Sequence, residues 1–330
     1  MSEYGTAPTL TTRASEVVAE VNNFYDRTLL EKAVPAFLYN RFAQVRDIPA
    51  NSGTNVIKFR KYGLLAANTT PLTEGVTPAG KALAVTDITA TVLRYGDYVT
   101  LTDKVVTETY DPILTETADI LGEQAGDTID ELCRDIVCAT STKQYAGAAT
   151  QTTEVDTNML LNRDEIKEAV RTLKTANAKP MTSMIDASTG FNTQPLNRCF
   201  IGIVHPSTAF DLDDASGWIP VQNYPNKGDV MENEIGSCAG VRFLESTNAK
   251  VRASGGANGI NVYSTLIIAQ NAYAQTRISG QTLKNIVKPL GSAGTADPLD
   301  QRTTSGWKLS YVAKVLDDTK LVDIQHAVSA

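Results

Sequence analysis

The sequence predicts an α+β fold, in which helices and strands are segregated along the chain. Three observations carry this prediction: β-branched alternation gathers at residues 54–102, one long helical stripe follows at residues 111–137, and short strands dominate the second half. A doubly wound parallel sheet would instead need strand and helix to alternate throughout. With 330 residues and 42% apolar side chains, the chain can bury a large core. About one to three domains are expected.

Composition argues against several classes of protein. A net charge of −7 disfavours a protein whose main task is to grip phosphate backbones. Two histidines, His205 and His326, leave few groups for zinc or for histidine-based catalysis. The four cysteines form no CxxC pair and are too sparse for a disulfide scaffold, which fits a reducing compartment. No apolar run reaches the roughly 18 residues that cross a bilayer, so we expect no membrane span. The first residues, Met1–Gly5, have no basic start followed by an apolar stretch, so we expect no signal peptide.

Residues 1–53 are expected to form an N-terminal arm. Apolar residues recur loosely at helical spacing, which predicts a helix from about Ser15 to Tyr39. Pro35 should interrupt this helix, because proline lacks the N–H group that a helix interior needs.

Residues 54–102 predict a long β-hairpin. Alternating segments at residues 56–60, 86–92 and 98–101 read as strands, and the polar stretch at 66–81 between them is rich in proline and glycine. A two-stranded ribbon is marginally stable by itself in water. Another part of this chain, or another chain, is therefore expected to cover it.

Residues 111–137 predict one continuous helix. Asp111 can cap it, and Pro112 suits the first helical position. At 1.5 Å per residue its length is about 40 Å. Its apolar stripe consists of Leu114, Ala118, Leu121, Ala125, Ile129, Leu132 and Ile136.

The same segment carries the acidity of the chain. Ten acidic and two basic residues lie between Asp103 and Asp135, a local charge of −8 that leaves the remainder at +1. The ordinary interpretation is a solvated helix face. The alternative is a face that meets basic groups of a partner.

The second half predicts mixed, short elements. Residues 140–157 and 211–234 are polar and are expected to be loops, whereas residues 164–176 predict a helix capped by Asn162. Strands are expected at residues 199–204, 240–245, 261–269, 282–287, 307–316 and 321–328.

One segment resembles a phosphate-binding loop and is rejected. Residues 75–82 approach the pattern GxxxxGK[ST], but Ala82 replaces the hydroxyl that holds magnesium and Pro78 removes a backbone donor. A strand-like run follows where that loop requires a helix.

Other candidate sites also favour a structural interpretation. Asp211, Asp213 and Asp214 could bind a hard cation but lack the remaining ligands of a calcium loop. The glycine-rich turn at 255–259 lacks the spacing of a dinucleotide site, and His205 has no nucleophile motif to serve. No catalytic residue, cofactor or metal ion is therefore expected.

A short basic cluster remains. Lys58, Arg60 and Lys61 follow one another on a predicted strand, where a solvated or inter-subunit face is more probable than contact with nucleic acid.

Several segments, in order, resemble the major capsid proteins of tailed bacteriophages, in the family typified by the coat protein of the Escherichia phage N-four. The proposed hairpin tip, Pro71-Leu72-Thr73-Glu74-Gly75-Val76-Thr77-Pro78, is similar to the hairpin-tip signature of that family. The other similar segments are Asn55–Phe59, Ile203–Pro206 with Asp211-Leu212, Gly236–Phe243, Gly306–Lys308 and Ala313–Leu316.

The resemblance implies the Hong Kong 97-type capsid fold. It divides the chain into an N-terminal arm (1–53), an extended hairpin loop (54–102), a spine helix with the start of a peripheral domain (103–157), an axial domain (158–289) and return strands of the peripheral domain (290–330). In such proteins the extended loop lies over the adjacent subunit, which answers what covers the hairpin. The polar stretch 140–157 has no assigned place in this scheme.

The implied function is assembly. Copies of the chain would form hexamers and pentamers that close into an icosahedral virion shell around double-stranded DNA, without sequence-specific binding and without a membrane. Portal, scaffolding and possibly decoration proteins are the expected partners, and the host cytoplasm is the expected place of assembly. Low positive charge inside suits a container that must release its DNA.

The charge separation motivates a hypothesis about contacts between subunits. Lys58, Arg60 and Lys61 are expected to face acidic residues of a neighbour's long helix, namely Glu123, Asp127 or Glu131, and the tip residues Leu72–Pro78 are expected to contact a neighbour too. A covalent lysine–asparagine crosslink through Lys81 is not expected, because no catalytic carboxylate is marked for it.

Two alternatives stay open. A compartment shell of the encapsulin type shares the implied fold but carries enzyme cargo. An α+β enzyme of the cytosol would instead be a monomer or small oligomer with a pocket of convergent polar groups.

Overall fold

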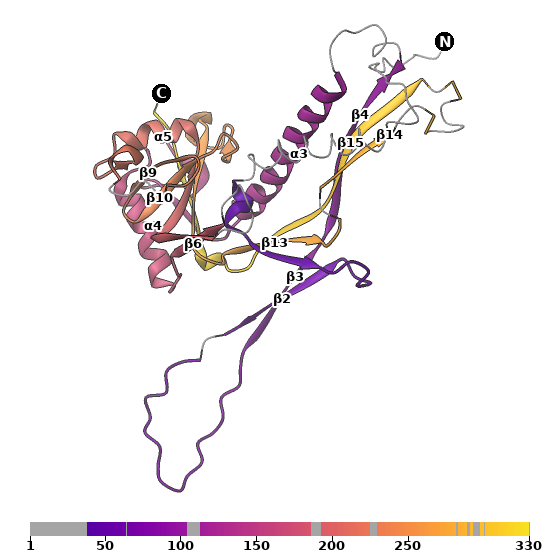
Figure 1. The fold of residues 1–330 in the computed structure, drawn as a ribbon. Coiled ribbons are helices and arrows are strands. Elements are labelled where there is room, and N and C mark those ends of the chain that lie inside the picture. The colour runs from indigo at the N-terminus through magenta and orange to yellow at the C-terminus, as the bar shows by residue number, and fades with distance from the viewer. Residues whose placement is uncertain are drawn as a thin grey trace.

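The computed structural model describes residues 38–63, 65–103, 113–185, 193–224, 230–281, 283–288, 291–292, 298–299 and 301–329. The chain forms a five-stranded sheet, a nine-stranded sheet and a separate two-stranded ribbon (Figure 1). The helices are α3 (Ile113–Val137), α4 (Arg163–Thr175) and α5 (Pro206–Asp213), with 3-10 turns η2 (Tyr39–Phe42), η3 (Thr152–Glu154), η4 (Val221–Asn223), η5 (Ala257–Gly259) and η7 (Asp318–Lys320). The α+β prediction is confirmed.

The strands lie mainly in the second half of the chain, as expected. They are β1 (Gln44–Ile48), β2 (Val56–Tyr62), β3 (Val85–Thr91), β4 (Leu93–Thr102), β5 (Lys143–Tyr145), β6 (Met181–Ile185), β7 (Thr193–Val204), β8 (Ile219–Pro220), β9 (Glu234–Cys238), β10 (Val241–Glu245), β11 (Val251–Arg252), β12 (Val262–Ile268), β13 (Tyr273–Ile278), β14 (Lys284–Lys288), β15 (Arg302–Val315) and β16 (Leu321–His326).

The five-stranded sheet is built around β15 and is covered on one face by α3. Its order is β1-β13-β15-β14, and β4 pairs with β15. The buried face of β15 presents Trp307, Leu309 and Tyr311 to α3. Gln124 of α3 fixes the alignment, since its side chain accepts from Trp307 Nε1 at 3.0 Å and donates to Asp97 Oδ2 of β4 at 2.7 Å.

The nine-stranded sheet has apolar residues on both faces. Its order is β5-β16-β12-β7-β10-β9-β8, with β11 on β12 and β6 on β7. On β7, Ile201 and Ile203 join the core around α3, whereas Phe200 and Val204 pack with α4 on the other face. Because alternate side chains of a strand point to opposite faces, a single strand contributes to two cores.

The stripe on α3 agrees with the prediction up to its final turns. Ala118, Leu121, Ala125 and Ile129 are buried, but the last two turns bury Cys133 and Val137 and leave Leu132 and Ile136 half-buried. Burial instead continues in steps of four, from Leu121 and Ala125 to Val137. Since an α-helix has 3.6 residues per turn, each step of four moves the buried side round the helix by about 40°.

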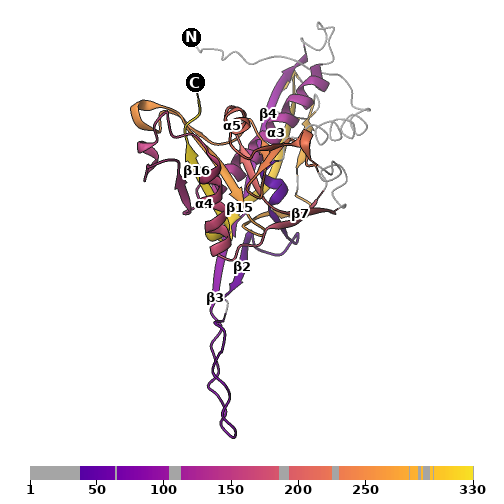
Figure 2. The ribbon, with the colours of Figure 1, turned by 90° about the vertical axis from the view of Figure 1, so that its left-hand side faces the viewer.

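The hairpin prediction is confirmed for its first two strands and corrected for the third. β2 and β3 pair antiparallel from Val56 with Thr91 to Tyr62 with Val85, and residues 65–84 form the irregular tip. The strand predicted at residues 98–101 was expected to belong to the hairpin. It is part of β4, which instead pairs with β15, from Leu93 with Tyr311 to Thr102 with Arg302. The ribbon and its tip project from the body in both views (Figures 1 and 2).

Other differences fall where strong tertiary pairings override weak local signals. Residues 211–234 were expected to form a loop, but residues 211–213 are the end of α5, which begins at Pro206. Part of the polar stretch 140–157 forms β5, which pairs with β16. Asn162 is the N-cap of α4, but its side chain makes no capping hydrogen bond. The helix expected at residues 15–39 lies largely outside the described residues, where η2 begins at Tyr39.

The two sheets do not follow the order of the predicted segments along the chain. β13 and β14 belong to the five-stranded sheet, although they lie inside the segment 158–289, and β16 belongs to the nine-stranded sheet. Within the described part of the chain, no helix combines the length and apolarity that a membrane span requires.

Candidate functional site

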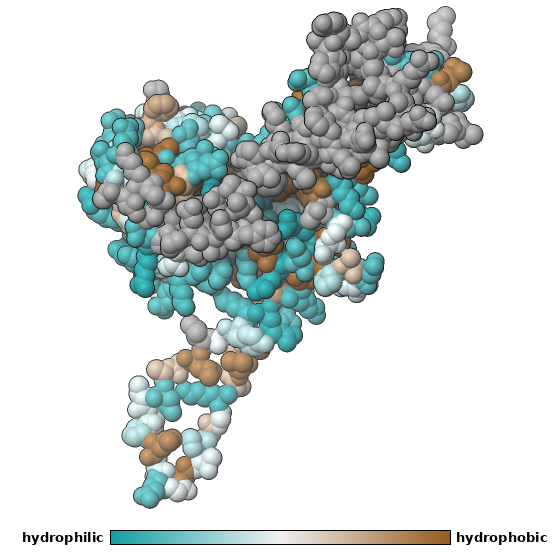
Figure 3. All heavy atoms as spheres, viewed as in Figure 1, coloured by the Kyte–Doolittle hydropathy of each residue, from teal (hydrophilic) through white to brown (hydrophobic). Residues whose placement is uncertain are grey.

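The extended loop, residues 63–84, is the most exposed part of the described chain. Leu72 is 74% exposed and Val76 is 62% exposed, and Leu65 and Leu83 are exposed too. Figure 3 shows apolar side chains on both arms of the loop, clear of the body. Burying such side chains is favourable by about 25 cal/mol per Å², so the loop leaves a stabilising contact unmade within one chain.

A tight turn shapes the end of this loop. The N–H of Val76 donates to the carbonyl oxygen of Thr73 at 3.2 Å, and Gly75 between them has a φ of +80°. That conformation at the third position is typical of a type II turn and favours glycine. Leu72, Glu74 and Val76 therefore end the loop as a compact knob, in which Glu74 occupies the corner of the turn.

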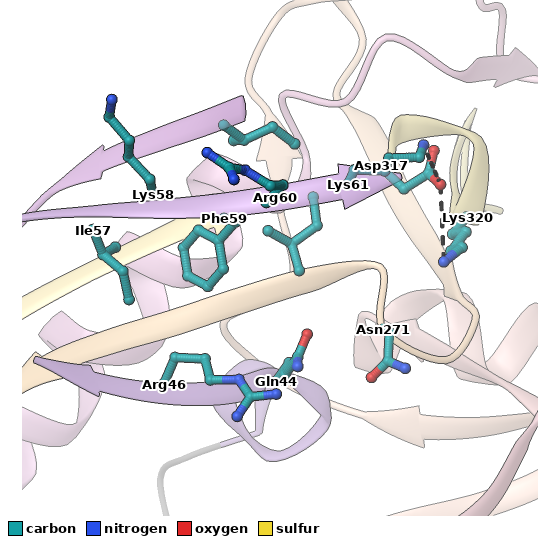
Figure 4. Close-up of a pocket in the computed structure, with 12 residues that line it drawn as sticks. Gln44, Arg46, Ile57, Lys58, Phe59, Arg60, Lys61, Asn271, Asp317 and Lys320 are labelled. Carbon is teal, nitrogen blue, oxygen red and sulfur yellow. Dashed lines mark ion pairs between the residues drawn. The ribbon is translucent and has the colours of Figure 1, made fainter. Parts of the chain in front are cut away.

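At its base, the ribbon lies over the five-stranded sheet, and a cavity lies between them. Figure 4 shows Ile57 and Phe59 of β2 pointing toward Gln44 and Arg46 of β1. The cavity between them has a volume of about 430 Å³ and is open to solvent on one side. The ribbon thus has an apolar inner face and a polar outer face, on which Lys58 points away from the cavity.

Two of the three basic residues at this base already have acidic partners in the same chain. Arg60 Nε donates to Asp87 Oδ1 across the ribbon at 3.0 Å, and this bond lowers the pKa of Asp87. Lys61 Nζ lies 2.6 Å from Asp317 Oδ2 of the body (Figure 4). Burial by itself would raise the pKa of Asp317, but the bonds from Lys61 and Thr319 outweigh it and the pKa is lowered.

The acidic side of α3 is engaged in a similar way. Asn248 Nδ2 donates to Asp127 Oδ1 at 3.3 Å, Arg134 pairs with Glu131 at 3.3 Å, and Lys250 pairs with Asp135 at 2.8 Å. The contacts of Asn248 and Lys250 connect the C-terminal half of the helix to the loop that follows β10, whereas the pair of Arg134 and Glu131 lies within the helix.

The structure therefore does not bring the two predicted charge sets together within one chain. Instead it gives Arg60, Lys61, Asp127 and Glu131 partners of their own. Of the three basic residues, Lys58 forms no ion pair with any described residue. Contact between these sets on neighbouring subunits stays a prediction, and Lys58 is its best remaining test.

A buried carboxylate joins the start of the described chain to α3. Asp130 Oδ1 accepts hydrogen bonds from the N–H groups of Leu38 at 3.0 Å and Tyr39 at 2.7 Å. Burial raises the pKa of Asp130 to about 6, against the opposing effect of these two bonds. Tyr273 and Tyr311 donate to the same segment, to the carbonyl oxygen of Tyr39 and to Asn40 Oδ1.

Sequence reasoning missed one surface, the face of the five-stranded sheet that points away from α3. Trp307 points toward α3, so its neighbours on β15, Gly306 and Lys308, point to the opposite face. Residues directly opposite each other on paired strands share a face. We call the part of this face on β4, β14 and β15 the open sheet face, and its exposed side chains are Arg94, Tyr98, Lys284, Ile286, Lys288, Arg302 and Lys308. Alternation along three strands was a readable signal, but only the pairing places these side chains together.

The remaining candidate motifs have structural roles. His205 Nδ1 accepts from Ser207 N–H at 3.2 Å and caps α5, and Asp211 accepts from Ser329 N–H at 3.1 Å. Residues 75–82 lie in the irregular loop, with no helix after them. All four cysteines are free and buried. Among the described residues, no group of three or more potential ligands could hold a metal ion.

Comparison with known proteins shows which family and which solved structures this chain resembles. Residues 84–324 match the family described as phage capsid protein. The capsid of Ralstonia phage GP4 has a similar structure, with a TM-score of 0.69, 13% identity and 89% of each chain covered. The head structure of Helicobacter pylori bacteriophage KHP40 matches with a TM-score of 0.62 at 11% identity, covering 89% of this chain and 90% of that one.

A virus-like particle from Pyrococcus furiosus shares the fold too, with a TM-score of 0.51, 12% identity and coverage of 92% of this chain and 99% of that one. No curated protein sequence matches the chain. The Hong Kong 97-type fold expected from the sequence is confirmed by the matching capsid structures. Since the family match spans most of the chain, the protein belongs to the phage capsid protein family and is a structural subunit of a capsid shell.

Proposed function

We propose that this chain is the major capsid protein of a tailed phage and forms hexamers and pentamers that close into an icosahedral shell around double-stranded DNA. The observation that carries the proposal is the projecting loop, whose Leu72 and Val76 are exposed and reach no part of the described body. Membership of the phage capsid protein family supports the same conclusion. A chain that leaves such side chains uncovered is suited to complete its packing on copies of itself.

The extended loop lies over the adjacent subunit in this proposal, and residues 72–78 contact that neighbour. Interfaces of this obligate kind typically bury more than about 2,000 Å². The five-stranded sheet with α3 corresponds to the peripheral domain, and the nine-stranded sheet with α4 corresponds to the axial domain. A head-to-tail contact of this kind generates rings when its rotation closes.

Portal, scaffolding and possibly decoration proteins complete the proposed assembly, which takes place in the host cytoplasm. The chain has no catalytic role and encloses DNA without sequence-specific contacts. Its acidic α3 segment and its net charge of −7 suit a container that must release its DNA.

Negative-stain microscopy with size-exclusion chromatography of the purified chain tests the proposal. Closed shells or capsomer rings are the expected result. A monomer whose hairpin is packed on its own body would contradict the proposal and favour the enzyme alternative.

The related alternative is a compartment shell that holds protein cargo, since the virus-like particle from Pyrococcus furiosus shows that the fold is not confined to phage capsids. The contents of particles isolated from the native source separate the two functions. Nuclease-protected double-stranded DNA is expected, whereas shells that hold protein cargo would favour the compartment.

A further inference from the structure

The two histidines of the chain lie on either side of one tyrosine, where α5 meets the nine-stranded sheet. The rings of His205 and Tyr263 have their centroids 5.1 Å apart, and Tyr263 stacks on His326 with 6.4 Å between centroids. Tyr263 and His326 are direct partners in the pairing of β12 with β16. Figure 1 shows α5 beside the C-terminal end of the chain. These three rings therefore connect the start of α5 to the last strand.

The helix α5 depends on His205 for its first hydrogen bonds. The N–H group of Ser207 donates to His205 Nδ1 at 3.2 Å. The N–H groups of Thr208 and Ala209 donate to the carbonyl oxygen of His205 at 2.9 and 3.1 Å. Helices as short as α5, which has eight residues, are not stable by themselves in water. Loss of the bond to Nδ1 therefore removes a substantial part of what holds the first turn.

A histidine at this position makes the cap of α5 sensitive to acid. Serine, threonine, asparagine and aspartate are the residues usually preferred there. The Nδ1 atom of His205 accepts from Ser207 only while the ring is neutral, because both nitrogens of a charged imidazole are donors. Burial lowers the pKa of His205, and the attraction of Glu245 on β10 opposes this only in part. The cap is therefore complete near neutral pH and is lost in acid.

The second histidine holds the end of β16 under the same condition. Its Nε2 accepts from the buried hydroxyl of Thr265 at 2.9 Å, and its Nδ1 donates to the carbonyl oxygen of Ala327 at 2.8 Å. A second proton on this ring would convert Nε2 into a donor, so that Thr265 could no longer donate to it. Burial lowers the pKa of His326 to about 4, although the bond to Ala327 and the charge of Asp211 on α5 both act to raise it.

A further contact ties α5 to the end of the chain. The carboxylate of Asp211 accepts hydrogen bonds from the N–H group of Ser329, at 3.1 Å, and from its hydroxyl. Only Thr208 and Leu212 of α5 are buried. Few core contacts therefore fix this helix, and the residues that follow β16 supply part of its attachment.

We propose that α5 and the end of β16 form an acid-released clasp, in which His205 and His326 hold α5 and residues 326–329 against the sheet while both rings are neutral. Because Asp211 connects the two elements, they loosen together. Both rings have a lower pKa in the closed clasp than in an unfolded chain, so the open form binds more protons and acid favours it below about pH 6.5. Phe210, which is 75% exposed on α5, moves with the clasp. The clasp belongs to the single chain and does not depend on the proposed function.

Hydrogen–deuterium exchange of the purified full-length chain at pH 7.5 and pH 4.5 tests the clasp. Labelling times are scaled to the intrinsic exchange rate at each pH. Peptides from α5 and from the end of β16 are compared with peptides from α4, whose N-cap Asn162 makes no side-chain hydrogen bond. Acid is expected to lower the protection of α5 by roughly fivefold relative to α4, the change that corresponds to a lost helix cap. Equal changes in α5 and α4 would overturn the proposal.

Two variants of His205 separate the cap from other effects of acid. Asparagine caps through an oxygen that does not titrate, so His205→Asn is expected to keep α5 protected at pH 4.5. His205→Ala removes the cap and should lower the protection of α5, and of the end of β16 with it, at both pH values. Loss of protection in acid by His205→Asn, to the extent seen in the wild type, would overturn the proposal. Full protection of the end of β16 in His205→Ala would contradict the joint movement.

The titration of the two rings can be followed directly. Because the chain has only two histidines, NMR of the imidazole groups gives two sets of signals, which His205→Asn assigns. Both rings are expected to titrate below the ordinary pKa of about 6.5, and His326 near 4. A ring that titrates at 6.5 or above in the folded chain would show that the clasp does not resist its charging, which would overturn the proposal.

Discussion

The extended loop and the body of this protein treat the same kinds of side chain in opposite ways. In the body, Phe243, Ile201 and Leu266 are completely buried between sheets and helices. In the loop, Leu72 and Val76 are largely exposed, and backbone and polar contacts hold the described parts of its arms together. The stability of the single chain therefore resides in the body, whereas the loop contributes when a second copy covers it.

Shortening the loop is expected to have the largest effect on assembly. Replacing residues 65–83 by an Asn-Gly turn should abolish shells, because it removes the surface that a neighbour covers. The thermal midpoint of the single chain should stay within a few degrees, since no core residue is lost. Microscopy checks the loss of shells, and calorimetry on the same preparation checks the thermal midpoint. Normal shells would show that assembly does not depend on the loop.

Truncating the core should have the converse effect. Phe243→Ala is expected to lower the free energy of unfolding by about 3–5 kcal/mol, because it leaves a cavity beside Trp218 and Gly202. Leu72→Ala should change it by less than about 0.5 kcal/mol. Denaturant titration of the two single-chain variants compares them directly. Equal losses would mean that the loop packs on its own body.

A buried histidine makes the stability of the body depend on pH. His326 lies in the core, its Nδ1 donates to the carbonyl oxygen of Ala327 at 2.8 Å, and its Nε2 accepts from Thr265 at 2.9 Å. Burial lowers its pKa to about 4. The unfolded chain therefore binds more protons between about pH 6.5 and 4, so the contribution of this residue is present above pH 6.5 and is lost as pH falls.

Over that interval the loss attributable to His326 is roughly 3 kcal/mol. His326→Gln should flatten the pH dependence measured by denaturant titration from pH 7.5 to 4.5. Asp130 has the opposite sign, because its raised pKa contributes stability that is lost as pH rises through about 6. Asp130 is present in both the wild type and His326→Gln, so its contribution cancels when the pH dependences of the two proteins are subtracted. Identical slopes would show that His326 titrates in the folded state at an ordinary pKa.

The anchor at Asp130 should have an intermediate effect. Asp130→Ala leaves the N–H groups of Leu38 and Tyr39 buried without an acceptor and should cost about 1–3 kcal/mol. Asp130→Asn keeps an acceptor oxygen in the same place and should cost less. Comparing the unfolding free energies of Asp130→Ala and Asp130→Asn at pH 7 separates the effect of losing the acceptor from the effect of losing the charge. A larger loss in the asparagine variant would contradict this role.

Reversing charge at the base of the ribbon should have the smallest effect on the single chain. Lys58→Glu should leave the unfolding free energy within about 0.5 kcal/mol, since Lys58 is exposed and forms no ion pair with a described residue. If Lys58 faces an acidic helix of a neighbour, the yield of shells should fall. Lys61→Glu is the comparison, because it breaks the pair with Asp317 inside the chain. Unchanged assembly of Lys58→Glu would remove the charge hypothesis.

The sequence by itself determined the elements whose causes are local. The period of apolar residues predicted α3, and alternation with a proline- and glycine-rich interval predicted β2, β3 and the loop between them. Exposure of the loop also followed, because a two-stranded ribbon has no core. The resemblance of its tip sequence to capsid proteins then indicated the family, which the match over residues 84–324 confirmed.

Only the tertiary structure decided which distant segments meet. β4 pairs with β15, about 200 residues away, because Tyr95 and Val99 can then pack under α3 with Trp307. The pairing of β14 with β15 completes the open sheet face, whose lysines lie on these two strands. The sequence could not predict the partners of Arg60, Lys61 and Asp127 either. Periodicity shows which side of a strand or helix is buried, whereas ion pairs and sheet register depend on what that side is buried against.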